Sequence, residues 1–318
     1  MIWLFLWQKQ YTKRVIQMIE IKSVTKKYGD FTAIENISLT VEDSSVLGLA
    51  GFNGSGKTTL LNVCAGIYRA ENGCVLLDGK DAFDNNNERL SLFYLPDNLW
   101  FPKGSTIKSA AKRYASYFPD FDFNILNKIC DIFGLDPKKS IRSLSKGMAR
   151  QASLAIAFAA KPKYLLIDET FDGLDPHKKE LVRKLLTEYI NDTEASVIIS
   201  SHDLREIAGV CDQVAIINGK SVILSCPLGD VSQHYRKVEM TFNMPVTELQ
   251  FSAINYRKLK LSGKKAYLTI CGDVEAELQK LNSLGAVEIN TTLLTLDEVF
   301  SEETEAVTDN EKIKSLFK

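Results

Sequence analysis

"GFNGSGKT", residues Gly51–Thr58, is the stretch of sequence that decides the fold. It fits the pattern G-x-x-x-x-G-K-[ST], follows the apolar run Val46–Ala50 and leads into the helical pattern "LLNVCAGIYRA". Glycines let backbone N–H groups wrap around phosphates, and the N-terminus of the following helix adds positive potential. With a strand before it and a helix after it, the stretch predicts a phosphate-binding loop rather than a chance glycine-rich turn.

This loop is expected to bind ATP together with Mg²⁺. Lys57 is expected to reach the β- and γ-phosphates and to assist hydrolysis, and the Thr58 hydroxyl to bind Mg²⁺. The nucleotide-binding residues expected along the segment are Gly51, Phe52, Asn53, Gly54, Ser55, Gly56, Lys57, Thr58 and Thr59.

A second motif, "YLLIDE", ends an apolar run in two adjacent carboxylates, Asp168 and Glu169. A buried strand that ends at Asp168 is expected to direct this carboxylate toward Mg²⁺. Hydrolysis needs a base or orienting group beside the attacking water, and Glu169 is the candidate. A helix-capping acid pair is the alternative, which a phosphate-binding loop in the same chain disfavours.

The chain reads as an α/β protein with a smaller accessory module. Strands alternate with helices through residues 18–233, which predicts a mainly parallel sheet covered on both faces, with a helical segment at about 98–150. Residues 234–302 read as a small α+β module, and residues 303–318 as a polar tail. A chain of 318 residues is long enough for both parts.

Composition limits the partners and the compartment. The formal net charge of −1 gives no global attraction to nucleic acid, and none is expected as a partner. The six cysteines form no C-x-x-C pair, so we expect free thiols in a reducing cytosol. The apolar run Met1–Trp7 is too short to span a bilayer. Residues 1–17 are expected to be an extension upstream of a natural start at Met18, and a short interfacial anchor is the alternative.

Further motifs resemble those of ATP-binding cassette (ABC) ATPases, the ATP-binding subunits of ABC transporters, over residues 18 to about 230. Beyond the two motifs above, the matches in order are "LSKGM" (Leu144–Met148), "GLDP" (Gly173–Pro176) and "SSH" (Ser200–His202). Tyr28 matches the aromatic residue that stacks on adenine. A kinase or GTPase would share only the phosphate-binding loop, so this resemblance is specific.

The resemblance implies a P-loop core with an antiparallel β subdomain and a helical subdomain, working as a head-to-tail dimer around two ATP molecules. Ser145 and Gly147 would contact the γ-phosphate across the interface, and Asp175 would connect the two sites. His202 would hold the γ-phosphate and help to orient Glu169 and water. The resemblance also implies a separately encoded membrane permease, with this chain on the cytoplasmic face of the membrane.

Two departures from the family pattern stand out. In the signature segment, Lys146 and Met148 replace a glycine and a glutamine, as in exporter-type cassettes with a separate permease. In "YLPDN" (residues 94–98), Asp97 stands where the family has a glutamine that offers an oxygen to Mg²⁺. Asp97 is expected to bind Mg²⁺ directly or through water. A plain Pro-Asp turn is the alternative that the sequence leaves open.

The sequence therefore predicts an ATPase that drives transport, with export as the expected direction. A homodimer and a heterodimer are both open, as is the transported substrate. The alternatives are a soluble ABC ATPase with a regulatory role and a sensor that binds ATP without turnover. One kind of soluble ABC ATPase acts on chromosome structure and has long heptad segments inserted in the cassette. No such segment appears between Thr59 and Ser145. Glu169 and His202 disfavour the sensor.

Overall fold

The computed structural model describes residues 18–85 and 90–304, so the expectations for residues 1–17 and for the tail beyond 304 lie outside them. The chain divides into two compact units, the first ending at Ser225 and the second beginning at Cys226. The sequence places this boundary after Gln233, because the change from alternating strands and helices to short strands becomes visible only there.

A six-stranded sheet forms the centre of the first unit, in the order β10-β9-β3-β8-β7-β6. The pairs β3–β8, β3–β9, β7–β8 and β6–β7 are parallel, as the alternating pattern predicts. β3, β7 and β8 are buried at every residue, which explains their continuous apolar runs. The strands are β3 (Val46–Ala50), β6 (Leu92–Leu95), β7 (Tyr164–Asp168), β8 (Ser196–Ser201), β9 (Gln213–Asn218) and β10 (Ser221–Pro227).

A smaller antiparallel sheet packs into the same core, which confirms the expected β subdomain. Its order is β2-β1-β4-β5. One hydrophobic cluster contains Ile19 and Ile34 from this sheet, Leu61 from α2 (Lys57–Cys64), and Leu49 and Ile198 from the central sheet. This shared core fixes the loop between β3 and α2. The strands are β1 (Ile19–Tyr28), β2 (Phe31–Val41), β4 (Asn72–Leu77) and β5 (Lys80–Asp81).

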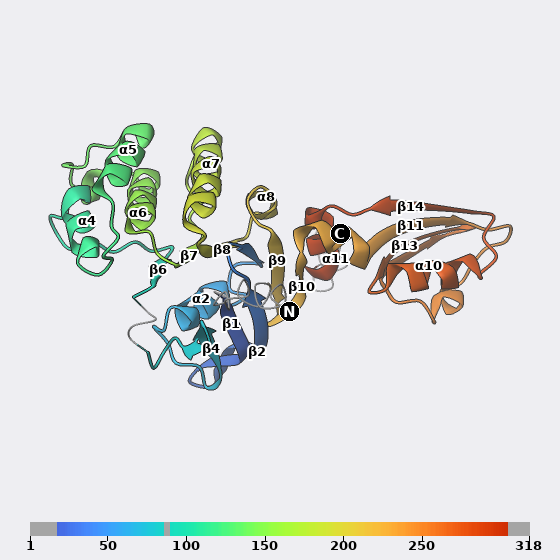
Figure 1. Cartoon of the computed structure of the whole chain (residues 1–318). Coiled ribbons are helices and arrows are strands. Elements are labelled where there is room, and N and C mark those ends of the chain that lie inside the picture. Colours follow the sequence, from blue (N-terminus) through green and yellow to red (C-terminus); the bar gives the residue numbers. More distant parts are fainter. Residues whose placement is uncertain (1–17, 86–89, 305–318) are drawn as a thin grey trace, which may run out of the picture. The chain divides into compact units, whose positions relative to one another are not determined.

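The remaining helices of the first unit begin at recognisable caps. Ser145 caps α6 (Lys146–Ala160) and Asp175 caps α7 (Pro176–Thr193), each by accepting from a backbone N–H three residues ahead. α4 and α5 pack against α6, and Figure 1 shows these three helices grouped together. The other helices of the unit are α4 (Ile107–Ala115), α5 (Phe123–Phe133) and α8 (Leu204–Ala208).

The second unit is an antiparallel sheet in the order β12-β13-β11-β14, with its own core. Val238, Phe251, Ile270 and Leu281 are buried in that core, the last from helix α10. The strands and helices are α9 (Val231–His234), β11 (Tyr235–Thr241), β12 (Tyr256–Ser262), β13 (Lys265–Cys271), α10 (Val274–Asn282), β14 (Glu288–Leu293) and α11 (Leu296–Thr304).

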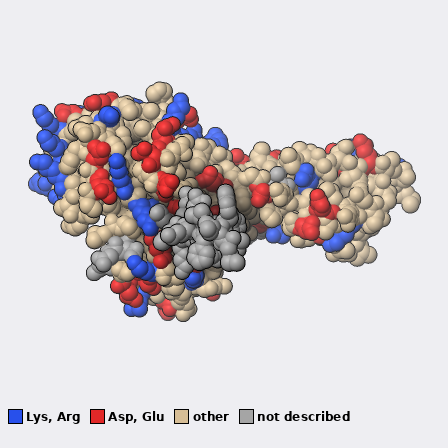
Figure 2. Space-filling model, viewed as in Figure 1, with Lys and Arg blue, Asp and Glu red and all other residues tan. Residues whose placement is uncertain are grey.

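The surface of the chain carries charges of both signs (Figure 2). Figure 2 shows acidic and basic side chains interspersed over the visible face, which agrees with the formal net charge of −1. Among the described residues, no helix has both the length and the apolar character needed to cross a membrane.

Candidate functional site

The phosphate-binding loop connects β3 to α2 at the carboxyl end of the central sheet. Gly56 has φ +105°, and a Cβ there would lie 2.4 Å from the Ile34 side chain, so only glycine fits. Gly54 also has a positive φ, of +84°. The Ser55 hydroxyl oxygen is buried and has no hydrogen-bond partner among the described residues. A backbone cradle with an unsatisfied buried hydroxyl fits a bound phosphate group.

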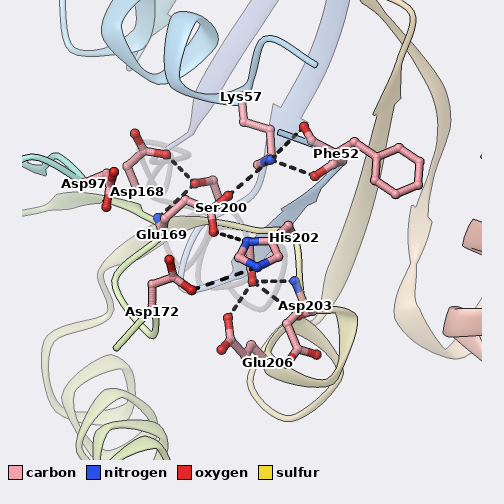
Figure 3. Close-up of polar contacts among 12 residues, drawn as sticks. Phe52, Lys57, Asp97, Asp168, Glu169, Asp172, Ser200, His202, Asp203 and Glu206 are labelled. Atoms are coloured by element: carbon pink, nitrogen blue, oxygen red, sulfur yellow. Dashed lines mark hydrogen bonds and ion pairs between the residues drawn. The ribbon is translucent and has the colours of Figure 1, made fainter. Parts of the chain in front are cut away.

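Lys57 lies at the centre of this loop with only 5% of its side chain exposed. Its Nζ donates to the Gly51 carbonyl oxygen at 2.7 Å and to the Phe52 carbonyl oxygen at 3.2 Å. The same Nζ lies 3.2 Å from Glu169 Oε1 (Figure 3). The sheet therefore joins the two sequence motifs through one buried ammonium group.

Asp168 ends β7 and is fully buried. The parallel register pairs it with Ser200 on β8, whose hydroxyl donates to Asp168 Oδ1 at 2.5 Å. Burial raises the pKa of Asp168, hydrogen bonds from Ser200 and Thr58 lower it, and the charges of Glu169 and Asp97 raise it again. The net shift is upward. A buried carboxylate with acidic neighbours beside the Thr58 hydroxyl is a donor set that fits Mg²⁺.

Glu169 follows β7 with φ +47°, an uncommon conformation for a residue with a side chain. Its backbone N–H donates to the Ser200 carbonyl oxygen at 3.2 Å, and its Oε2 lies 2.7 Å from His202 Nδ1. Burial raises the pKa of Glu169, but the hydrogen bonds from His202 and Lys57 outweigh burial and leave it below its usual value. Glu169 is therefore ionised near neutral pH, as a base must be.

His202 follows the end of β8, with 42% of its side chain exposed. The hydrogen bond to Glu169 raises its pKa, burial lowers it, and the charges of Glu169 and Asp172 raise it again. The net shift is upward. Its Nε2 lies 3.9 Å from Asp172 Oδ1 (Figure 3).

We expect replacement of Glu169 with Gln to lower the pKa of His202. The imidazolium then loses its charged partner, because the amide cannot supply a negative charge. In the wild type, the pairing with Glu169 raises the pKa of His202 and so stabilises the folded state. This stabilisation is fully present at pH values below the ordinary histidine pKa, and it is lost as the pH rises through the raised pKa. NMR titration of the His202 ring would measure the change, with a His202→Ala spectrum to assign its resonance. An unchanged pKa in Glu169→Gln would contradict the pairing.

The residues expected to act across a dimer have local contacts in the single chain. The Ser145 hydroxyl accepts from the Met148 N–H at 3.2 Å, and Asp175 Oδ1 from the Lys178 N–H at 2.9 Å. A Cβ on Gly147 would lie 2.8 Å from the Gly173 carbonyl oxygen, so the start of α6 packs closely on the "GLDP" loop.

Tyr28 is the last residue of β1. It is 45% exposed and makes an edge-to-face contact with Tyr68, with ring centroids 5.8 Å apart. An exposed ring of this kind is open to stacking on an adenine.

Asp97 has an unforeseen partner. Its Oδ1 accepts from the guanidinium group of Arg150, which comes from the second turn of α6 and was not among the predicted site residues. The signal in the sequence is an arginine inside "MARQASLAIAFAA", the one charge in an otherwise uncharged stretch. Asp172 was also missed, since nothing marks it apart from its neighbours. Magnesium binding by Asp97 stays a prediction.

Comparisons with known proteins agree with the family resemblance of the sequence. A family model described as "ABC transporter" matches residues 34–172. The ABC transporter ATP-binding protein YtrB of Bacillus subtilis (strain 168) is 29% identical over 283 residues, covering 89% of this chain and 97% of that protein. The methionine import ATP-binding protein MetN of Clostridium tetani is 30% identical over 216 residues, covering 64% and 68%.

A further relative agrees with the family, and a solved structure shares the fold. The lipopolysaccharide export system ATP-binding protein LptB of Haemophilus influenzae is 27% identical over 225 residues, covering 65% of this chain and 90% of that protein. The solved structure of an ATP-binding subunit of an ABC transporter has a TM-score of 0.63 at 23% identity. The match covers 67% of this chain and 91% of that chain. This chain belongs to the ABC transporter family, as a subunit that binds and hydrolyses ATP.

Proposed function

We propose that this chain hydrolyses Mg-ATP within a head-to-tail dimer and thereby drives a separately encoded membrane permease. The observation that carries the proposal is the contact of Glu169 with both Lys57 and His202, because it places an ionised base beside the phosphate-binding loop. In this arrangement Lys57 binds the β- and γ-phosphates, and Glu169 orients the attacking water and accepts its proton.

The metal is assigned to the residues beside this base. Thr58 and Asp168 would hold Mg²⁺, with Asp97 as a further candidate, and the metal would neutralise charge on the phosphates. His202 holds Glu169 in place through its Nδ1.

The dimer is proposed from the position of the signature segment. Ser145 and Lys146 are exposed at the N-terminus of α6, so the cap and the helix dipole are accessible to an anion held by a second subunit. Ser145 and Gly147 would contact the γ-phosphate bound by the partner, and Asp175 would lie between the two sites.

The permease contact is proposed at the turn that follows β6. Trp100 is 79% exposed, beside a small pocket of about 50 Å³ lined by Tyr94, Leu99 and Phe101, among others. An exposed aromatic residue that lines a pocket is typical of an interaction site. We infer that this chain is held on the cytoplasmic face of the membrane through that contact. The named relatives include import and export proteins, and we propose export from Lys146 and Met148 in the signature segment.

Affinity purification of the tagged chain from native membranes tests this function. We expect a protein with several membrane-spanning segments to co-purify, with two copies of this chain per assembly by native mass spectrometry. Trp100→Ala should reduce the recovery of this membrane protein at least several-fold, because the variant removes a large contact area at the proposed interface. Leu249→Ala is the control, since Leu249 is 81% exposed and lies in the second unit. Co-purification of ribosomes or nucleic acid instead would overturn the transport role.

A further inference from the structure

Arg150 is a buried charge that connects three separate segments of the first unit. Its residue exposure is 2%. Nη1 donates to the carbonyl oxygen of Glu169 and, at 2.9 Å, to that of Asp172. Nη2 donates to the Asp97 carboxylate and lies 3.5 Å from the Asp97 carbonyl oxygen. The loop after β6, the loop after β7 and helix α6 therefore meet at one guanidinium group.

The chemistry of this contact requires arginine. A buried cation is costly unless a counter-charge and hydrogen-bond acceptors surround it, and Asp97 supplies the counter-charge here. The planar guanidinium group can donate to acceptors on two sides at once, whereas a lysine ammonium group acts as a point charge. Arg150 can therefore fix the distance between Asp97 and the backbone of Glu169.

The backbone of Glu169 is the part of the site that needs such support. A non-glycine residue with a positive φ is strained and persists only where its surroundings hold it. Ser200 holds the N–H of Glu169, and Arg150 holds its carbonyl oxygen. Between these two contacts, the side chain is directed at Lys57 and His202.

We propose that Arg150 is a positioning residue for hydrolysis, which holds the Glu169 backbone in register with the Asp97 turn. The proposal rests on the proposed role of Glu169 as the base. Asp97 lies two residues beyond the end of β6 and three before Trp100, so it belongs to the turn assigned to the permease contact. A shift of this turn would reach Glu169 through the guanidinium group. Asp97 then affects turnover through Arg150, by a route that does not require contact with the metal.

Steady-state kinetics of single and double variants test this proposal. Arg150→Gln and Asp97→Asn should each lower kcat about 10- to 100-fold and leave KM for ATP within about threefold, because misplacing a catalytic group slows the chemical step. In the double variant the two effects should not multiply, because each breaks the same contact. Compared with Arg150→Gln, Arg150→Lys should recover most of the thermal stability, because it keeps the positive charge. It should recover little of the kcat, because it loses the planar geometry.

Matched controls separate positioning from general stability. Lys163→Gln removes another ion pair of the same unit, the one with Asp78, and should reduce stability while kcat stays unchanged. The pKa of the His202 ring should also move in Arg150→Gln and stay constant in Lys163→Gln, because only the former displaces the Glu169 carboxylate. If Arg150→Gln does not fold, Asp97→Asn and Arg150→Lys provide the same comparison.

Three results would overturn the proposal. The first is an unchanged kcat in folded Arg150 variants of an enzyme that Glu169→Gln inactivates. The second is full multiplication of the two single effects. The third is that high Mg²⁺ concentration restores the kcat of Asp97→Asn, both with Arg150 present and in the double variant. That result is expected of a metal ligand. If Glu169→Gln retains the wild-type turnover, the proposed role of Glu169 as the base is wrong, and this result is distinguishable from the three above.

Discussion

Replacing Glu169 with Gln is expected to lower the kcat for ATP hydrolysis by about 10²- to 10⁴-fold, the usual contribution of a general base. Glutamine keeps the size of the side chain and can still accept a hydrogen bond from His202, but it cannot take a proton from water. Affinity for ATP should remain within a few-fold, because the phosphate-binding loop is unchanged. A phosphate-release assay measures kcat, and the thermal shift caused by Mg-ATP measures binding.

Glu180→Gln is the control for the loss of a carboxylate. Glu180 is half-exposed on α7, where it pairs with Arg183. This variant should hydrolyse ATP at the wild-type rate. If Glu169→Gln also hydrolyses ATP at that rate, Glu169 has no part in the chemical step.

Replacing Lys57 with Ala is expected to weaken ATP binding by about 100-fold or more. A hydrogen bond to a charged group contributes about 1.5–3 kcal/mol, and one such bond at the upper end corresponds to about a 100-fold change in Kd. Lys57 also neutralises Glu169, so its loss leaves that carboxylate beside the anionic phosphates. The thermal shift caused by Mg-ATP should therefore disappear in Lys57→Ala, whereas it persists in Glu169→Gln.

Lys184→Ala is the matched control for the loss of a lysine. Lys184 is exposed on α7 and lies 3.9 Å from Glu180. It should bind ATP with wild-type affinity. Wild-type affinity in Lys57→Ala as well would show that the nucleotide binds elsewhere.

The short-range features of the site could be predicted from sequence because the interactions that form them are local. The glycine spacing of the loop, the strand ending at Asp168 and the helix beginning after Ser145 each depend on residues within a few positions. Caps of this kind satisfy the first N–H groups of a helix with the nearest side-chain oxygen. The family resemblance gave the order of these motifs, and the fold confirms the expected sheets.

The boundary between the two units was placed less well. β10 continues the pattern of the first unit and ends at Pro227, and the change to short strands becomes visible in the sequence only after Gln233. Compactness depends on contacts between distant residues, which a pattern read along the chain does not contain.

The sequence by itself determined the glycine-rich loop at Gly51–Thr58, from which nucleotide binding is predicted, and the acidic pair after a buried strand. Only the tertiary structure decided that Asp97 pairs with Arg150, because they are 53 residues apart and meet through the packing of α6 against the loops. The same holds for the φ of Glu169, which hydrogen bonds from Ser200 and Arg150 hold. A buried charge obtains its partner from the fold, and no local pattern specifies that partner.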